Sequence, residues 1–598
     1  MKRTHTCGEL RSADIGKKVC VQGWVRFFRD HGGVEFIDLA DAYGITQLVF
    51  DPEDTNGADK EKISETLRLF TRESVVSVDG VVRKRVDGTE DPKNKTGEVE
   101  VLITSAEVLN RSKAPPFEIG DQKESVLPGE ETRLRYRYLD LRRTEMREVL
   151  MFRHKFISAA REYLEKNGFV DIETPMLTKS TPEGARDFIV PSRVHPGTFY
   201  ALPQSPQLFK QMLMIGGMDR YYQVARCFRD EDSRADRQPE FTQLDMEMSF
   251  VDTKDIQTMV EGLMAHVWKV LYGERLETPF RRISFDEAMN RYGSDKPDLR
   301  YELPMADITN VVKDAPYEIF QKVLSKGGTV VGFNVKSEIA GDMIGRNEID
   351  RLISFVKNNG LGGMTWMRAT KDSLDSNIAK YFTPGALSDL KSTLDVREGD
   401  LLLLLAGSKN NVLETGGLLR KKLAEDLGLI EPGAFRFAWI VDCPMFEVDP
   451  ASGKRDAFHH PFVMPMTSLN SDDVKGASFD LVLNGSELGS GSQRIHDPEI
   501  QREVFRLLGI SEEKAETDFG FFLEALGYGA PPHGGIALGV DRMISILLKK
   551  ETIRDVIAFP KNKKAQSLLD GSPQKVNDER LEELQILSMA IDDIKDIG

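Results

Sequence analysis

Residues 227 to 247 read CFRDEDSRADRQPEFTQLDME, a pattern typical of two strands joined by a charged loop. Apolar residues mark both strands, whereas the joining residues are almost all charged or polar. Arg229, at the end of the first strand, can bind a phosphate through two parallel charge-assisted hydrogen bonds. Phe241, on the returning strand, offers a face on which a base can stack. A surface hairpin laced with ion pairs has the same pattern, so this segment alone leaves both interpretations open.

Two further segments carry candidate chemistry. Residues 531 to 542 read PPHGGIALGVDR, where close glycines would let a strand-to-helix junction approach a ligand and Arg542 begins the helix. Residues 480 to 494 read DLVLNGSELGSGSQR. There Asp480 and Glu487 are carboxylates of the kind that hold Mg²⁺ beside a phosphate chain, and Arg494 adds a positive fork. In the second segment, Gly489 and Gly491 would clear space beside Arg494. Ordinary packing explains most glycine-rich turns, so that alternative stays open for residues 531 to 542.

The composition is that of a soluble globular chain with several domains. The chain has 598 residues, 29% of them charged and 40% hydrophobic, which excludes a disordered tail protein. The net charge of −16 argues against a surface built for non-specific nucleic-acid binding, although residues 133–143 (RLRYRYLDLRR) form a local basic cluster. That cluster indicates either a solvated or subunit-facing surface or a contact to a polyanion.

Cellular location follows from what the sequence lacks. The longest strongly apolar stretch, Leu401 to Ala406, is too short for a bilayer core of ~30 Å, and the first residues lack the apolar core of a signal peptide. Four cysteines (Cys7, Cys20, Cys227 and Cys443) are scattered without a C-x-x-C, so we expect free buried thiols, no disulfide framework and no zinc. We expect a cytoplasmic protein without a membrane segment.

The organisation of the chain predicts a split catalytic domain. Five short alternating segments between residues 17 and 108, with a helix from Asp59 to Phe70 between the third and fourth, predict an OB-fold β-barrel, although a generic small barrel has the same strand count. The expected parts are an OB-fold domain at 1–110, a hinge at 111–140, a catalytic domain in two pieces at 141–285 and 421–560, an inserted α+β domain at 286–420 and a C-terminal extension at 561–598.

Together the motifs resemble those of class II aminoacyl-tRNA synthetases, and most closely the bacterial-type aspartyl-tRNA synthetases. GFVDIETPML (168–177), FRDE (228–231) and GGIALGVDR (534–542) are similar to the three ordered signature motifs of the class. TPEGARDF (181–188), LPQSPQLFKQ (202–211) and HHPF (459–462) add to the likeness, which runs over essentially the whole chain. The resemblance implies an antiparallel-sheet catalytic domain, a homodimer, and the ligation of aspartate to tRNA with ATP and Mg²⁺.

The resemblance also assigns roles to residues of this chain. It makes Arg229, Arg542 and Glu487 catalytic, with Asp480 and Glu487 holding Mg²⁺. The residues implied to bind aspartate are Glu183, Ser205, Gln207, Lys210, Arg229, Asp245, His459 and Arg494. Of these, Lys210 and Arg494 would bind the side-chain carboxylate of the substrate. Its ammonium group would be bound by Glu183, Ser205, Gln207 and Asp245. The residues implied to bind ATP are Arg229, Asp230, Glu231, Gln238, Phe241, Glu487, Gly539, Val540, Asp541 and Arg542.

For the OB-fold domain the resemblance implies anticodon recognition. Phe36 would stack a base, and Arg29, Gln47 and Glu98 would bond base edges, although alternation along its strand also allows Phe36 a place in the barrel core. His31 and Gly88 resemble the family members that aspartylate both tRNA-Asp and tRNA-Asn, which would require an amidotransferase acting on Asp-tRNA-Asn. A strictly tRNA-Asp-specific ligase is the alternative.

Rival functions within the same fold are an asparaginyl- or lysyl-tRNA synthetase, a tRNA-independent asparagine synthetase, and a non-enzymatic binding module. Lys210 and Arg494 suit neither a neutral amide nor a cationic side chain. An asparagine synthetase has no use for the N-terminal barrel. A binding module would typically have lost one of Arg229, Arg494 and Arg542.

Overall fold

The computed structural model describes residues 2–54, 60–119, 127–181, 184–340, 343–371, 373–449, 451–471 and 473–588. It divides into two compact units. The first comprises residues 1–154, 233–238 and 548–575, and the second comprises residues 155–232, 239–547 and 576–598.

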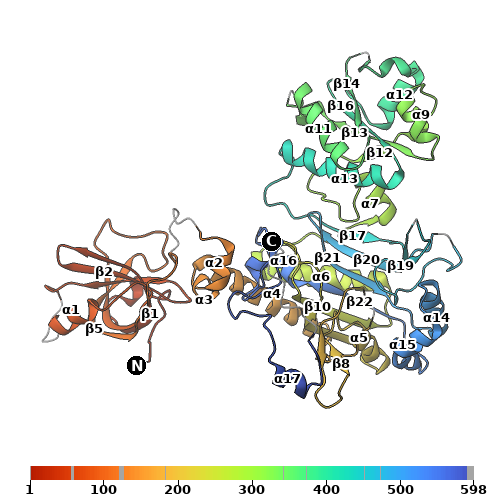
Figure 1. Cartoon of the computed structure of the whole chain (residues 1–598). Helices are drawn as coiled ribbons and strands as arrows, with labels where there is room; N and C mark the ends of the chain where they lie inside the picture. The colour runs from red at the N-terminus through yellow and green to blue at the C-terminus, as the bar shows by residue number, and fades with distance from the viewer. Residues whose placement is uncertain are drawn as a thin grey trace. The chain divides into compact units, whose positions relative to one another are not determined.

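The first unit contains a closed five-stranded barrel with the strand order β1-β2-β3-β5-β4, drawn in red to orange in Figure 1. Its elements are β1 (Lys18–His31), β2 (Val34–Ala40), β3 (Ile45–Phe50), α1 (Lys60–Leu67), β4 (Val75–Lys84) and β5 (Val99–Asn110). Alternating inward residues such as Val19, Val21, Val76 and Val78 fill the barrel, and Leu67 of α1 packs on the same cluster. The predicted barrel with a helix between its third and fourth strands is confirmed.

The arginine cluster of residues 133–143 lies on α2 (Glu130–Arg135), α3 (Arg137–Asp140) and the residues that follow. Arg137 and Arg143 are buried and donate to the two oxygens of Asp140 at 2.6 and 2.7 Å. Arg137 also donates to the backbone carbonyls of Arg554, Ile557 and Ala558. The expectation of a solvated face is therefore wrong for these two arginines, because buried guanidinium groups must satisfy their donors inside the protein.

The second unit is built on an eight-stranded, mostly antiparallel sheet with the order β11-β17-β20-β21-β22-β10-β9-β6. Its strands are β6 (Val170–Asp171), β9 (Arg220–Phe228), β10 (Glu240–Ser249), β11 (Arg281–Ser284), β17 (Phe437–Val441), β20 (Ser478–Leu483), β21 (Ser486–Gln493) and β22 (His533–Gly539). Small two-stranded sheets pair β7 (Ile189–Pro191) with β8 (Phe199–Ala201) and β18 (Phe446–Val448) with β19 (Arg455–Ala457).

Helices accompany this sheet, and Figure 1 shows α6 and α5 beside its strands. They are α4 (Thr144–Lys166), which begins in the first unit, α5 (Gln207–Ile215), α6 (Thr253–Tyr272), α7 (Phe285–Tyr292), α14 (Pro498–Leu507), α15 (Glu512–Leu526), α16 (Val540–Leu547) and α17 (Asp578–Glu583). Three short 3₁₀ turns lie at Ser12–Asp14, Ala379–Tyr381 and Ile553–Val556. Among the helices that the structure describes, none combines the length and apolar character needed to cross a bilayer.

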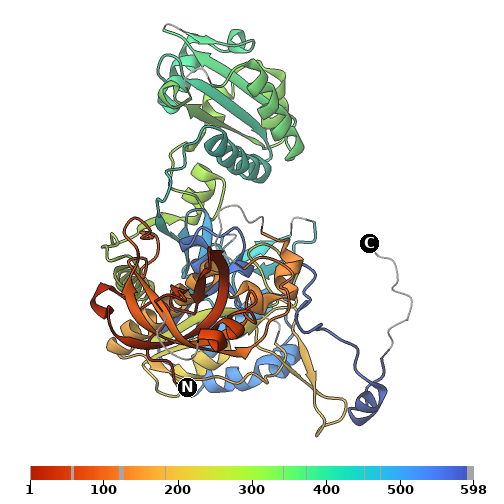
Figure 2. The ribbon, with the colours of Figure 1, turned by 90° about the vertical axis from the view of Figure 1, so that its left-hand side faces the viewer.

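The inserted segment forms its own five-stranded sheet with the order β12-β13-β16-β14-β15 (Figures 1 and 2). Its elements are β12 (Met305–Asp307), α8 (Thr309–Val312), α9 (Glu318–Leu324), β13 (Thr329–Val335), α10 (Ser337–Ala340), α11 (Arg346–Asn358), β14 (Met364–Ala369), β15 (Leu374–Asp375), α12 (Pro384–Thr393), β16 (Leu401–Gly407) and α13 (Lys409–Asp426). Leu401, Leu403 and Leu405 pack with α11 and α13, whereas Leu402 and Leu404 pack with α8, α9 and α12. The apolar run of β16 is thus a central strand covered on both faces.

The glycines of the C-terminal motifs serve strand packing. A Cβ on Gly535 would lie 2.0 Å from the Met246 carbonyl oxygen and 2.1 Å from Glu247 Oε2. A Cβ on Gly489 would lie 2.2 Å from the Ala537 carbonyl oxygen, and one on Gly491 would meet the Phe479 ring at 2.6 Å. The expectation that these glycines open space for a ligand is therefore wrong for Gly535, Gly489 and Gly491, because neighbouring strands already fill that space.

Candidate active site

A buried quartet of charges lies at the centre of the sheet. It consists of Lys210 on α5, Asp245 and Glu247 on β10, and Arg494 directly after β21, and each side chain is at most 2% exposed. Asp245 and Glu247 share one face of β10 because side chains two apart on a strand point the same way. Two cations balance two anions, so the quartet satisfies the requirement that buried charges be paired.

Glu247 holds Arg494 in one orientation. Arg494 Nε donates to Glu247 Oε1 at 2.9 Å, and Nη2 donates to Oε2 at 3.1 Å. Arg494 Nη1 donates to Ser492 Oγ and to His460 Nε2 at 2.5 and 2.7 Å. A guanidinium has five N–H groups, so one N–H on Nη2 is left to bind a carboxylate. Burial opposes ionisation of Glu247, but Arg494 and Lys210 outweigh it and lower its pKa.

Lys210 and Asp245 form the other half of the quartet. Lys210 Nζ lies 2.7 Å from Asp245 Oδ1 and 3.3 Å from Glu247 Oε2. Asp245 Oδ2 is buried and receives no hydrogen bond from the residues that the structure describes. Burial raises the pKa of Asp245, although Lys210 opposes the shift. A buried carboxylate oxygen without a partner is an acceptor suited to an ammonium group.

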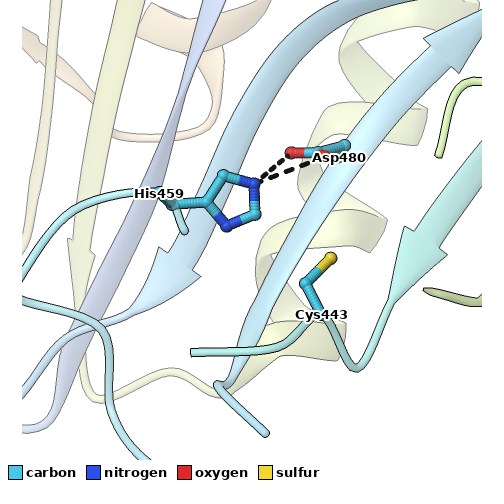
Figure 3. A group of neighbouring side chains, drawn as sticks. All are labelled: Cys443, His459 and Asp480. Carbon is cyan, nitrogen blue, oxygen red and sulfur yellow. Dashed lines mark hydrogen bonds and ion pairs between the residues drawn. The ribbon is translucent and has the colours of Figure 1, made fainter. Parts of the chain in front are cut away.

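His459, Asp480 and Cys443 form a neighbouring cluster, whose oxygen, nitrogen and sulfur atoms lie within 4.8 Å of one another (Figure 3). His459 Nε2 lies 3.1 Å from Asp480 Oδ1. Burial disfavours protonation of His459, but Asp480 outweighs it and raises the pKa of the ring. Burial also raises the pKa of the Cys443 thiol, so a zinc ion would have to displace protons from both ligands. The absence of zinc stays a prediction.

The predicted magnesium carboxylates lie on neighbouring strands. Asp480 is on β20 and Glu487 on β21, two strands paired in antiparallel register. Asp480 is paired with His459, whose Nε2 lies 3.1 Å from Oδ1 and 3.3 Å from Oδ2, and Lys296 Nζ lies 3.3 Å from Glu487 Oε2. Hard carboxylate oxygens with spare lone pairs fit Mg²⁺, which would neutralise phosphate charge when bound.

Arg229 and Phe241 face each other across the β9–β10 hairpin. The Arg229 guanidinium carbon lies 5.2 Å from the centre of the Phe241 ring, a cation–π distance. Arg229 Nε is buried and has no hydrogen-bond partner among the described residues. The predicted strand–loop–strand arrangement is confirmed, and the candidate phosphate-binding arginine keeps a donor available.

At the β22–α16 junction, Arg542 and Asp541 make hydrogen bonds within the protein. Arg542 Nη1 donates to the backbone carbonyl oxygen of Glu487 at 2.7 Å, which ties α16 to the strand that carries this predicted magnesium ligand. Asp541 Oδ2 accepts a hydrogen bond from Thr242 N at 2.8 Å, and Val540 is buried. A Cβ on Gly539, by contrast, would lie 3.5 Å from its nearest neighbour, an ordinary contact distance. Contacts of Gly539, Val540 and Asp541 with ATP stay predictions.

The remaining predicted residues of the active site are spread more widely. Ser205 lines a small cavity with Thr178, Lys179 and Gln204, and Gln207 begins α5. Asp230 is exposed, and its backbone forms an isolated antiparallel β-bridge with that of Arg186. Glu231 is half-buried. Gln238 belongs to the first unit, where its Oε1 accepts from Lys561 N at 2.9 Å. Glu183 lies outside the described residues.

On the barrel, Phe36 is half-buried on β2, and its ring centre lies 6.0 Å from that of the exposed His31. Arg29 Nη2 donates to Asp38 Oδ2 at 2.9 Å, and Gln47 Nε2 donates to Glu100 Oε2 at 2.8 Å. Glu98 accepts a hydrogen bond from Ser12 Oγ. Gly88 has a φ of +86° and no atom within 4 Å of a Cβ position.

Sequence reasoning missed the side chains that hold the quartet in place. Glu247 and His460 bind Arg494, and Gln211 and His533 lie beside Lys210 and Arg494. The spacing of Asp245 and Glu247 on one predicted strand could have indicated the role of Glu247. No local pattern could have indicated Gln211 and His533, which are 322 residues apart.

A closed five-stranded barrel and a mostly antiparallel sheet that carries a buried charged quartet are what the resemblance to class II aminoacyl-tRNA synthetases leads us to expect. The family described as tRNA synthetases class II (D, K and N) matches residues 129–563, and an OB-fold nucleic acid binding domain matches residues 19–109. The chain belongs to this class II synthetase family, whose members are enzymes that use ATP.

Individual relatives extend over the whole chain. A protein of Desulfatibacillum aliphaticivorans named aspartate–tRNA(Asp/Asn) ligase is 48% identical over 593 residues, 98% of each chain. A Bacillus subtilis protein of the same name is 48% identical over 590 residues, again 98% of each. The solved asparaginyl-tRNA synthetase of Pyrococcus horikoshii, complexed with asparaginyl-adenylate, has a TM-score of 0.58 at 21% identity and covers 94% of this chain and 98% of that one. The last likeness supports the fold alone.

Proposed function

We propose that this chain is an aspartate–tRNA ligase that acts on tRNA-Asp and also on tRNA-Asn. The observation that carries the proposal is the buried quartet, which leaves one N–H of Arg494 for a side-chain carboxylate and Asp245 Oδ2 for an ammonium. Aspartate carries both groups. The names of the relatives that match over 98% of the chain agree with this substrate.

The reaction needs alignment and charge neutralisation rather than a protein nucleophile. The α-carboxylate of aspartate attacks the α-phosphorus of ATP, which forms aspartyl-adenylate and releases pyrophosphate. A terminal ribose hydroxyl of tRNA then takes the aspartyl group, and AMP leaves. In this proposal Arg229 binds the α-phosphate, Phe241 and Arg542 hold the adenine between them, and Asp480 and Glu487 hold Mg²⁺.

Recognition of tRNA is proposed for the barrel. Phe36 presents a half-buried ring beside His31, an arrangement suited to stacking an unpaired base. Gly88 has no side chain, and the space around its Cβ position is open. A loop with this open space would tolerate either base at the third anticodon position. Use of both tRNAs would require an amidotransferase that converts Asp-tRNA-Asn to Asn-tRNA-Asn in the same cytoplasm.

A homodimer is also part of the proposal. The segment of the first signature motif exposes Val170, Met176 and Leu177, which are 50%, 39% and 52% exposed. Exposed apolar side chains gathered in one segment support a surface that another protein covers. Light scattering coupled to size exclusion should give twice the chain mass.

The test is separate charging of purified tRNA-Asp and tRNA-Asn with labelled aspartate, ATP and Mg²⁺. Charging of both supports the whole proposal, whereas charging of tRNA-Asp alone overturns the relaxed specificity and keeps the ligase. If neither tRNA accepts aspartate, ammonia-dependent asparagine formation becomes the function to test.

A matched pair of variants sharpens the specificity test. His31→Leu should reduce charging of tRNA-Asn relative to tRNA-Asp. The control His195→Leu alters another exposed histidine, outside the barrel, and should leave that ratio unchanged.

A further inference from the structure

Three buried polar side chains form a hydrogen-bonded chain beside the charged quartet. His533 Nδ1 lies 2.7 Å from the Pro531 carbonyl oxygen, and His533 Nε2 lies 3.1 Å from Gln211 Nε2. Gln211 Oε1 lies 2.8 Å from Gln207 Nε2. Gln211 and His533 are fully buried, and Gln207 is 7% exposed. The chain therefore runs from a backbone carbonyl at β22 to the first residue of α5.

One backbone carbonyl fixes the direction of every hydrogen bond in this chain. A carbonyl can only accept, so His533 Nδ1 must carry the proton that binds Pro531. Burial lowers the pKa of His533, which keeps the ring neutral and leaves Nε2 as an acceptor. Gln211 must therefore turn its NH₂ toward His533 and its oxygen toward Gln207. Gln207 must in turn donate its own NH₂, which leaves its Oε1 as the outer end of the chain.

The position of Gln207 connects this end to the amino-acid site. Gln207, Lys210 and Gln211 lie on one face of α5, because residues three and four apart on a helix are neighbours. Lys210 binds Asp245, whose Oδ2 is the unpaired acceptor of the quartet. His533 is also tied to the quartet, since its carbonyl oxygen accepts from Arg494 N at 2.8 Å.

We infer that Gln211 and His533 are positioning residues that lock the Gln207 amide with its oxygen toward the α-ammonium of the amino-acid substrate. This inference rests on the proposed function, in which Gln207 belongs to the aspartate site. Without the chain, the Gln207 amide could turn over and present its NH₂ to a cation. The chain therefore selects for an amino group, whereas Lys210 and Arg494 select for the side-chain carboxylate.

The experiment compares two adenylate analogues that differ only in the ammonium group. One is the sulfamate analogue of aspartyl-adenylate, and the other carries hydrogen in place of the α-amino group. Calorimetry gives the ratio of their dissociation constants for each variant. In Gln211→Met the preference for the amino compound should fall by about ten- to a hundredfold, the range for a lost hydrogen bond to a charged group. Binding of the deamino compound should stay within a few fold.

A conservative variant separates orientation from simple packing. Gln211→Glu keeps an acceptor for Gln207 Nε2 and can accept from a protonated His533, so it should retain most of the preference that Gln211→Met loses. Gln257→Met is the matched control, because Gln257 is a 2% exposed glutamine on α6 whose Oε1 accepts from Arg282 at 2.8 Å. It should lose stability without any change in the ratio.

The outcomes distinguish the inference from the proposed function. An unchanged ratio in Gln211→Met, or an equal loss of both analogues in a folded protein, would overturn the positioning role. Failure of the wild-type protein to bind either analogue would instead overturn the proposed function. Circular dichroism and melting temperature identify any variant that has not folded.

Discussion

Glu247 and Arg494 bind each other through two parallel hydrogen bonds of 2.9 and 3.1 Å in the core of the catalytic sheet. Both side chains are at most 2% exposed. Gly535 makes the pair possible, because a Cβ at that position would lie 2.1 Å from Glu247 Oε2. The orientation of Arg494, the residue proposed to bind the substrate carboxylate, is thus set by neighbouring strands and not by Arg494 alone.

Arg494→Leu should collapse activation of aspartate while leaving ATP binding largely intact. Removing one partner of a buried pair costs about 2–5 kcal/mol, which corresponds to roughly thirty- to several-thousand-fold. Aspartate-dependent pyrophosphate exchange and calorimetry with ATP give the two readouts. Unchanged aspartate kinetics would contradict the assignment of Arg494.

Arg420→Leu is the control for the loss of a buried arginine. Arg420 is 2% exposed and donates to the carbonyl oxygens of Asp298 and Tyr301, so its loss should destabilise the fold. The KM for aspartate of the folded fraction should not change. A rise equal to that of Arg494→Leu would mean that both effects come from general destabilisation.

Arg229→Lys should lower the rate of adenylate formation by about a hundredfold or more, because a lysine cannot donate two parallel hydrogen bonds to a phosphate. Single-turnover formation of aspartyl-adenylate is the measurement. Arg226→Lys alters an exposed arginine on the same strand, paired with Glu240, and should have little effect. A rate for Arg229→Lys close to that of wild type would exclude a phosphate contact that depends on the guanidinium fork.

The stability of the catalytic unit should fall as the pH drops below about 6.5. Burial lowers the pKa of His533, and burial together with Arg494 lowers that of His460 well below the ordinary value. In this range the unfolded chain binds more protons than the folded one, so each ring can remove up to about 1.4 kcal/mol per pH unit. His459 acts in the opposite direction, because Asp480 raises its pKa and the stability it contributes at low pH is lost as the pH rises through the folded pKa.

Urea unfolding between pH 7.5 and 5.5 checks this expectation. His460→Asn should flatten the dependence, whereas the exposed control His195→Asn should not. A wild-type slope of zero in this window would mean that the buried rings take up protons in the folded state.

The native protein should resist thiol reagents. All four cysteines are buried, and burial raises their pKa values, that of Cys227 to about 12. Because the thiolate is the reactive form, iodoacetamide at pH 8 should modify four thiols only after denaturation. Mass spectrometry counts the adducts. Rapid native modification of Cys443 would show that the cluster with His459 and Asp480 opens to solvent.

Patterns of apolar and polar residues within one short segment correctly predicted the strands whose structure depends on that segment alone. The barrel strands alternate with period two, and the charged loop between Phe228 and Glu240 separates two apolar strands, so both follow from the sequence. The motifs also placed Arg229 at the end of β9 and Arg542 at the start of α16. The same patterns misjudged Arg137 and Gly535, since burial of a charge and the approach of another strand are not local properties.

The sequence by itself determined the family, the barrel, the split catalytic domain and the identity of the charged residues Lys210 and Arg494. Only the tertiary structure decided what holds them, because Glu247 meets Arg494 and Gln211 meets His533 across 247 and 322 residues of chain. The direction of the hydrogen bonds in this buried chain is set by the one group that can only accept, the Pro531 carbonyl oxygen. Such a constraint exists only once distant strands and helices are packed together.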